Sequence, residues 1–226
     1  ELTPEKKSRL TLSSGESLEF HQVIIATGRH PQTSGLDLSL LGIQLGKKGE
    51  IQIDDECKVL GKTNVWAAGD VTAIAPFTHT ANYQARVITE NIIGSKRKAN
   101  YLAIPRAIYT DPPVASVGNL KSEGKTTEIA TSQIELSEVS RNATDGENGG
   151  LLILAANMAT GVLVGASAIG PHADEWMSEA TLAIRAEIPL SLLVDLVHAF
   201  PTFSEAFETP LRDLDRQQKI FKSESK

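Results

Sequence analysis

The sequence predicts an α+β fold in which helices pack on one antiparallel sheet. Two observations from the second half of the chain lead to this class. From Ala103 onward, short apolar runs are separated by turn residues, a pattern typical of strands. Segments with helical character follow, from about Ala173 to Ala186 and from about Leu190 to Val197. Strands and helices that occupy separate stretches of sequence are expected in α+β domains.

The N-terminal part predicts a β-hairpin and then a buried strand. Arg9 to Leu12 alternates polar and apolar residues, Ser13 to Gly15 turns the chain, and Ser17 to Phe20 returns. Val23 to Ala26 is a continuous apolar run, as expected of a strand covered on both faces. It ends in Thr27 to Pro31, where a glycine lets the backbone approach a ligand.

The middle of the chain predicts two strands, a helix and a linker. Glu50 to Asp54 alternates as a short strand, and Asn64 to Asp70 is an apolar strand that runs into an elbow of small residues. Thr78 to Ile93 has helical spacing, and Gly94 and Ser95 stop the helix. The stripe expected to face the core is Ala81, Ala85, Ile88 and Ile92. Lys96 to Tyr101 has the composition of a solvated domain linker.

The strands predicted for the second half are joined by tight turns. Pro105 to Tyr109 is followed by the turn Asp111 to Pro113 and the strand Val114 to Val117, and we expect Tyr109 to pack in the sheet. Leu151 to Ala155 and Val162 to Ile169 form a hairpin.

The uncharged stretch around this hairpin is long enough to cross a bilayer. However, Asn157, Thr160 and Gly161 form a turn cluster at its centre, which favours the hairpin over a membrane span.

Composition narrows the class of protein. Of the 226 residues, 41% are hydrophobic and 22% are charged, which is too apolar for a disordered chain. One cysteine cannot form an internal disulfide, so a cytoplasmic location is expected. The net charge of −6 argues against a nucleic-acid-binding surface, and only the short run Lys96 to Lys98 is strongly basic.

The strongest local indication of a ligand site is Ala67 to Asp70. Small side chains let a ligand come close to the backbone, and a carboxylate just beyond a strand can accept hydrogen bonds from ligand hydroxyls. Because motifs of this size are common, an ordinary aspartate at the end of a strand explains the pattern equally well.

Several chemical motifs are missing from the sequence. No glycines fall in a Gly-x-Gly-x-x-Gly arrangement, so no pyrophosphate-binding loop is expected. Cys57 has no cysteine partner for redox chemistry and is interpreted as a structural thiol. The five histidines lack the spacing of zinc ligands, so no metal site is expected.

Five segments of the chain stand out in order: VIIATGRHP, TNVWAAGDV, FTHTANYQAR, IPRAIYTDPPVASVG and VHAFPTFSEAF. In this order they resemble the C-terminal half of the flavin-dependent pyridine nucleotide-disulfide oxidoreductases, which include dihydrolipoamide dehydrogenase, glutathione reductase and mercuric reductase. The resemblance covers nearly the whole chain and implies that it is a fragment, because the family's glycine motifs and redox cysteines lie upstream. It also implies that FAD and NAD(P)H binding needs that upstream half.

The resemblance implies three regions. Residues 1–32 resemble the tail of the nicotinamide-binding domain, residues 33–99 the second part of the FAD-binding α/β domain, and residues 100–226 the dimerisation domain, an antiparallel sheet with helices.

Cofactor-binding roles follow residue by residue from the resemblance. Asp70 matches the aspartate that holds the flavin ribityl chain, and Gly69 allows the close approach. The start of a helix whose N-terminus faces the flavin ring is matched by Phe77, Thr78 and His79; a plain helix start is the alternative. The crossing between the two cofactor domains is matched by Thr27, Gly28 and Arg29; for Arg29, an exposed structural role is the alternative.

The sequence departs from the family at the C-terminal motif. Disulfide reductases carry a histidine acid/base directly before Pro-Thr, and a glutamate a few residues later orients it. Here Glu205 is kept, but Phe200 occupies the base position and cannot transfer a proton. His198 is a possible substitute, with packing at a surface or interface as the alternative.

Two hypotheses about function follow. In the first, the parent enzyme transfers hydride from NAD(P)H through FAD to a small-molecule electron acceptor other than a conventional disulfide, such as a quinone, a metal ion or a small thiol compound. In the second, the chain is a non-catalytic module that only pairs subunits. Both imply a homodimer, and the expected interface patch is Phe200, Pro201, Phe203 and Phe207.

Overall fold

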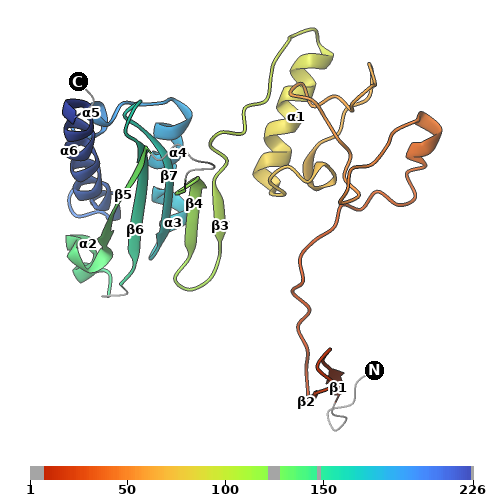
Figure 1. Ribbon diagram of the computed structural model, residues 1–226, viewed down its shortest axis with the longest axis horizontal. Coiled ribbons are helices and arrows are strands. Elements are labelled where there is room, and N and C mark those ends of the chain that lie inside the picture. Colours follow the sequence, from red (N-terminus) through yellow and green to blue (C-terminus); the bar gives the residue numbers. More distant parts are fainter. Residues whose placement is uncertain (1–7, 122–127, 147–148, 225–226) are drawn as a thin grey trace.

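The computed structural model describes residues 8–121, 128–146 and 149–224 (Figure 1). At the N-terminal end, β1 (Ser8–Thr11) and β2 (Ser17–Phe20) pair antiparallel, with Leu10 opposite Leu18. The predicted hairpin is therefore confirmed. Figure 1 shows that it lies away from the rest of the molecule, at the end of an extended segment.

The extended segment corrects the prediction of a covered strand at Val23 to Ala26. These residues form no strand, and Ile24 and Ile25 are 91% and 80% exposed. A strand requires a neighbour for its backbone hydrogen bonds, and none of the described residues supplies one here. Residues 23–26 therefore have the composition of a strand but pair with no other strand among the described residues.

Residues 33–77 fold mainly as turns around a small apolar core made of Ile43, Ile51, Val59 and Ala67. The predicted strands at Glu50 to Asp54 and Asn64 to Asp70 are reduced to isolated bridges, such as Ile53 with Val59 and Lys58 with Trp66. Two 3₁₀ turns complete this region, η1 (Leu38–Leu41) and η2 (Gly69–Thr72). The predicted elbow is therefore a 3₁₀ turn.

The predicted helix is confirmed as α1 (Thr78–Ile92), but it buries a different face. Its buried side chains are Thr80, Gln84 and Val87, whereas Ala85 and Ile92 are exposed. The polar Gln84 is fully buried because backbone and hydroxyl groups below the helix satisfy its amide, so hydrophobicity alone predicts the wrong stripe.

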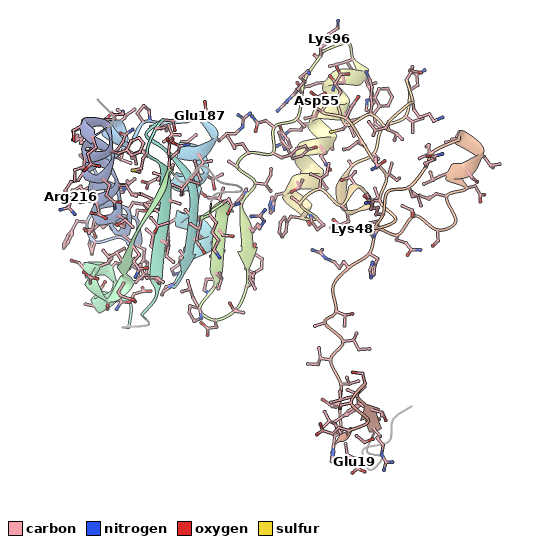
Figure 2. The ribbon with its side chains drawn as sticks, viewed as in Figure 1. Glu19, Lys48, Asp55, Lys96, Glu187 and Arg216 are labelled. Atoms are coloured by element: carbon pink, nitrogen blue, oxygen red, sulfur yellow. The ribbon has the colours of Figure 1, made fainter. Side chains whose placement is uncertain are left out.

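The linker after α1 is docked rather than fully solvated. Lys98 pairs with Asp55 at 2.8 Å, the Ala99 N–H donates to the carbonyl of Asp55 at 2.6 Å, and Arg97 pairs with Glu90. Figure 2 shows Asp55 beside α1 and Lys96 beyond the C-terminal end of this helix.

The C-terminal part contains a five-stranded antiparallel sheet of order β3-β4-β7-β6-β5. Its strands are β3 (Arg106–Ile108), β4 (Val114–Gly118), β5 (Ile129–Glu135), β6 (Leu151–Asn157) and β7 (Val162–Ile169). The hairpin predicted from residues 151–169 is confirmed as β6 and β7, with Leu154 opposite Ala166. Strand β5 had no counterpart among the predicted elements.

Helices cover this sheet, as Figure 1 shows. The predicted helix at 173–186 is two helices, α3 (Ala173–Trp176) and α4 (Ser178–Arg185), and the next one is shorter than predicted, α5 (Leu190–Leu193). The remaining elements are η3 (Leu136–Glu138), α2 (Ser140–Thr144), η4 (Phe203–Phe207) and α6 (Glu208–Glu224). Helix α4 packs on β7 and α6 packs on β5. Among the described residues, no helix combines the length and the apolar character that crossing a membrane requires.

Two aromatic predictions are wrong. Phe207 is 1% exposed and meets the Trp176 ring edge-on at 5.8 Å between centroids, and Phe203 is also buried in the chain's own core. Only Phe200, at 75% exposure, remains a strongly exposed member of the predicted interface patch. Tyr109 is exposed instead of packed in the sheet, because it lies just beyond the end of the short edge strand β3.

Candidate functional site

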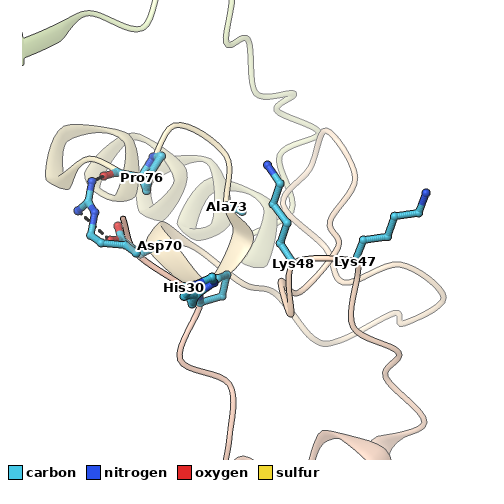
Figure 3. A pocket seen from close by; sticks show the side chains of 8 residues that line it. His30, Lys47, Lys48, Asp70, Ala73 and Pro76 are labelled. Carbon is cyan, nitrogen blue, oxygen red and sulfur yellow. Dashed lines mark hydrogen bonds and ion pairs between the residues drawn. The ribbon is translucent and has the colours of Figure 1, made fainter. Parts of the chain in front are cut away.

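A pocket of about 650 Å³ lies where the extended N-terminal segment meets the turn before α1 (Figure 3). Four basic residues, one carboxylate and three apolar residues line it: Arg29, His30, Lys47, Lys48, Asp70, Pro31, Ala73 and Pro76. Arg29 Nη1 lies 3.3 Å from Asp70 Oδ2, and Nη2 donates to the carbonyl of Pro76 at 2.9 Å. The fold thus brings the predicted residues Arg29 and Asp70 together, although 41 positions separate them.

The turn that carries Asp70 has an unusual backbone. Gly69 has φ +77°, and a Cβ there would lie 3.2 Å from the Cβ of Ala81. Ala73 and Ala75 also have positive φ values of 54° and 41°, which non-glycine residues rarely adopt. Small residues therefore let this turn pass close to α1, with the Asp70 carboxylate half exposed in the pocket.

The start of α1 lies next to this turn. Phe77 is its N-cap and makes no side-chain capping hydrogen bond, and its ring stacks on His79 at 5.1 Å between centroids. His79 Nε2 lies 2.8 Å from the carbonyl of Pro105, so its imidazole is directed to the residue just before β3. The first N–H groups of a helix have no partners within the helix, so this end favours negative charge nearby.

The turn has a buried support that sequence reasoning missed. The Gly69 N–H donates to Gln84 Oε1 at 2.6 Å, and the Thr72 hydroxyl donates to the Gly69 carbonyl at 2.8 Å. Gln84 lies within the segment FTHTANYQAR, which carries part of the family resemblance, but it was assigned no role from the sequence; its only other signal is an amide between apolar positions of the predicted helix.

The C-terminal motif presents Phe200 outward. Phe200 precedes a cis peptide bond to Pro201, and its side chain is exposed. Glu205 Oε2 accepts from the Thr202 N–H at 2.9 Å in a capping box at the start of η4. Glu205 therefore has a structural partner in this chain, while the base position carries no titratable group.

His198 is enclosed between two helices. Its side chain is 5% exposed, and Nε2 lies 3.1 Å from both carboxylate oxygens of Glu179 on α4. Its Nδ1 lies 3.4 Å from Glu208 Oε1 at the start of α6, without a hydrogen bond. Burial raises the pKa of Glu179, although the hydrogen bond from His198 opposes the shift. In this chain the His198 imidazole is therefore held between α4 and the start of α6.

The sequence matches two family descriptions that share one family name. Residues 104–211 match the dimerisation domain of pyridine nucleotide-disulphide oxidoreductases, and residues 1–85 match the pyridine nucleotide-disulphide oxidoreductase description itself. The chain belongs to this family of oxidoreductases, and its C-terminal part carries the family's dimerisation domain.

Individual relatives agree with this assignment. Dihydrolipoyl dehydrogenase from Geobacillus stearothermophilus is 30% identical over 192 residues, which cover 84% of this chain and 41% of the relative. Mercuric reductase from Staphylococcus aureus is 31% identical over 202 residues, 88% of this chain and 37% of the relative. The chain thus spans less than half the length of these curated relatives.

Solved structures show the same architecture. LpdA from Mycobacterium tuberculosis superposes with a TM-score of 0.81 at 25% identity, covering 91% of this chain and 45% of that one. The flavoprotein disulfide reductase RclA from Escherichia coli gives a TM-score of 0.81 at 24% identity, over 94% and 48% of the two chains. The second match supports the fold alone.

Proposed function

We propose that this chain forms the C-terminal half of an FAD-dependent NAD(P)H oxidoreductase, to which it contributes part of the flavin pocket and the homodimer interface. The observation that carries the proposal is the half-exposed Asp70 carboxylate, set on a glycine turn in the 650 Å³ pocket beside the start of α1. Family membership supplies the chemical class.

The residues present fit a flavin nucleotide. A carboxylate accepts hydrogen bonds from ribityl hydroxyls, the positive φ at Gly69 lets the ligand approach the backbone, and the α1 N-terminus favours developing negative charge. When bound, the flavin supplies the hydride and electron relay between nicotinamide and acceptor. Arg29 would have to release or share Asp70 as the ligand binds.

We propose the three regions expected from the sequence, 1–32, 33–99 and 100–226. Their support is the separation of the hydrophobic clusters, one within residues 43–67 and the other within residues 103–214. The exposed Ile24 and Ile25 support a nicotinamide-binding domain completed by a further segment, because such a run requires a sheet to cover it.

We propose that the electron acceptor is not a conventional disulfide. Phe200 cannot donate or accept a proton, Glu205 caps η4, and His198 is held by Glu179, so these three residues offer no free base at the motif. A quinone or a metal ion, each of which can take up electrons without proton transfer from an imidazole base, fits this site.

The spectrum of the complete protein tests this function. We would express the whole reading frame and titrate its flavin anaerobically with NADH and with NADPH. Binding of FAD that is weakened at least tenfold by Asp70→Asn, but not by the exposed control Asp37→Asn, supports the flavin pocket. A protein that binds no flavin contradicts it.

The same titration distinguishes acceptor classes. Bleaching of the flavin without a long-wavelength thiolate-to-flavin band supports direct transfer to a quinone-like or metal acceptor. Appearance of that band shows a redox cysteine pair in the other half and contradicts the simpler relay.

The second candidate is an assembly module without catalysis. One observation favours it, because residues 103–214 share a single core that does not depend on the pocket region. Dimerisation by a full-length protein that carries no flavin would select this alternative.

A further inference from the structure

Gln84 is a fully buried amide directly beneath the turn that carries Asp70. Its Oε1 accepts from the Gly69 N–H at 2.6 Å. Its Nε2 donates to the hydroxyl of Tyr101 at 3.1 Å and approaches Thr72 Oγ1 at 3.5 Å. One side chain of α1 therefore meets the first residue of η2, the last residue of η2 and the linker.

The proton directions in this cluster follow from the backbone N–H of Gly69. A backbone N–H can only donate, so the amide oxygen must face Gly69 and the amide nitrogen must face the two hydroxyls. The Thr72 hydroxyl gives its proton to the Gly69 carbonyl, which leaves its oxygen free to accept from Gln84. With the Gln84 amide in this orientation, each of these hydrogen bonds has one donor and one acceptor.

Tyr101 extends the cluster into the linker. Its oxygen accepts from Gln84, and the same hydroxyl lies 3.7 Å from Cys57 Sγ, with which it shares a second hydrogen bond. Burial raises the pKa of Tyr101 to about 12, so the hydroxyl stays protonated. Tyr101, the last residue of the linker, therefore forms a hydrogen bond with Gln84, which in turn supports the turn that carries Asp70.

We propose that Gln84 is a positioning residue for Asp70, and that Tyr101 holds Gln84 in its working orientation. The inference rests on the proposed role of Asp70 as a flavin-binding carboxylate. Gln84 does not contact the pocket itself; it fixes both backbone groups of Gly69, directly at the N–H and through Thr72 at the carbonyl. Loss of the amide leaves a buried N–H without its partner and frees the turn to shift.

A double-mutant cycle on the complete flavoprotein tests the proposal. The FAD dissociation constant is measured by quenching of flavin fluorescence for wild type, Gln84→Met, Asp70→Asn and the double variant. We expect Gln84→Met to weaken FAD binding about tenfold, the effect of one buried hydrogen bond. In the Asp70→Asn background the same change should have an effect below about twofold, because the two residues act as a unit.

A second variant distinguishes the proposed role of Gln84 from a general loss of folding. Gln84→Glu is close to isosteric, and its protonated acid can accept from Gly69 and donate to Tyr101, whereas its carboxylate can only accept. FAD affinity of Gln84→Glu should therefore recover toward wild type between pH 8 and pH 5.5, measured against the wild-type protein at each pH. Tyr101→Phe should weaken binding about threefold.

The outcomes are distinguishable. Equal losses from Gln84→Met in both backgrounds, or no recovery of Gln84→Glu at lower pH, overturn the positioning role while leaving the flavin pocket standing. An Asp70→Asn variant that binds FAD like wild type overturns the proposed function and this inference together.

Discussion

At the scale of single residues, the contact between Arg29 and Asp70 is conspicuous but energetically small. Both side chains are more than half exposed, and the closest approach is 3.3 Å. Exposed ion pairs contribute about 0–1 kcal/mol, because water and salt screen them.

We therefore expect Arg29→Ala to change the free energy of unfolding by less than about 1 kcal/mol. Urea denaturation followed by tryptophan fluorescence measures it. A loss of several kcal/mol would mean that Arg29 organises the turn through the Pro76 carbonyl rather than merely pairing with Asp70.

The contact between Glu179 and His198 should make the free energy of unfolding depend on pH. Because burial raises the pKa of Glu179 in the folded state, the folded chain binds this proton more tightly than the unfolded chain. The favourable contribution is thus complete below the unfolded pKa of Glu179 and is lost as the pH rises through its raised value.

Comparison with the Glu179→Gln variant isolates the contribution of Glu179 to the free energy of unfolding. The stability of wild type relative to the variant should fall as the pH rises above the ordinary pKa of a glutamate, with a slope of at most about 1.4 kcal/mol per pH unit. Urea melts of both proteins at several pH values measure it. A difference that rises with pH would show that pairing with His198 outweighs burial.

At the scale of elements, two phenylalanines only seven positions apart have opposite roles. Phe207 ends η4 and fills the core against Trp176, whereas Phe200 precedes the turn into η4 and faces outward. The 3₁₀ turn at 203–207 rotates the later ring into the core of the same chain.

Matched truncations test this difference. Phe207→Ala should lower the free energy of unfolding by about 3–5 kcal/mol, because it leaves a cavity in a packed core. Phe200→Ala should lower it by less than about 0.5 kcal/mol when measured on the monomer. Similar losses for both variants would contradict the burial seen here.

At the scale of the whole molecule, the apolar side chains that follow α5 are exposed in the single chain, and we expect a partner to bury them. Val197 and Phe200 are strongly exposed and Leu196 is half exposed, within a part of the chain that matches a dimerisation domain. A second copy of the chain is the partner that this match favours.

Val197→Asp should therefore shift the protein from dimer to monomer, because a buried unpaired carboxylate is costly at an interface. Sedimentation velocity over a range of concentrations measures the shift, and Leu40→Asp, at an exposed leucine of η1, is the control. A wild-type chain that stays monomeric at high concentration would contradict the predicted dimer.

Local patterns determined several elements correctly. The hairpin of β6 and β7 follows from two apolar runs around a turn cluster, and α1 follows from helical spacing with a glycine stop. Turn chemistry and periodicity act over a few residues, so the sequence reveals them directly. The candidate pocket residues Arg29 and Asp70 were also named from motifs alone, through a family resemblance.

Other features were decided only by tertiary contacts. Val23 to Ala26 has strand composition but pairs with no described strand, and α6 was missed although it completes the core. The buried face of α1 was misassigned because Gln84 is satisfied by groups from Gly69 and Tyr101, which lie 15 and 17 positions away.

The sequence by itself therefore determined the class of fold, the family and two of the residues that line the pocket, Arg29 and Asp70. The tertiary structure decided which of these residues meet, that His198 is enclosed by Glu179, and that Phe207 is core while Phe200 is surface. The physical reason is that burial and hydrogen-bond satisfaction depend on neighbours distant in sequence, whereas propensity depends on neighbours along the chain.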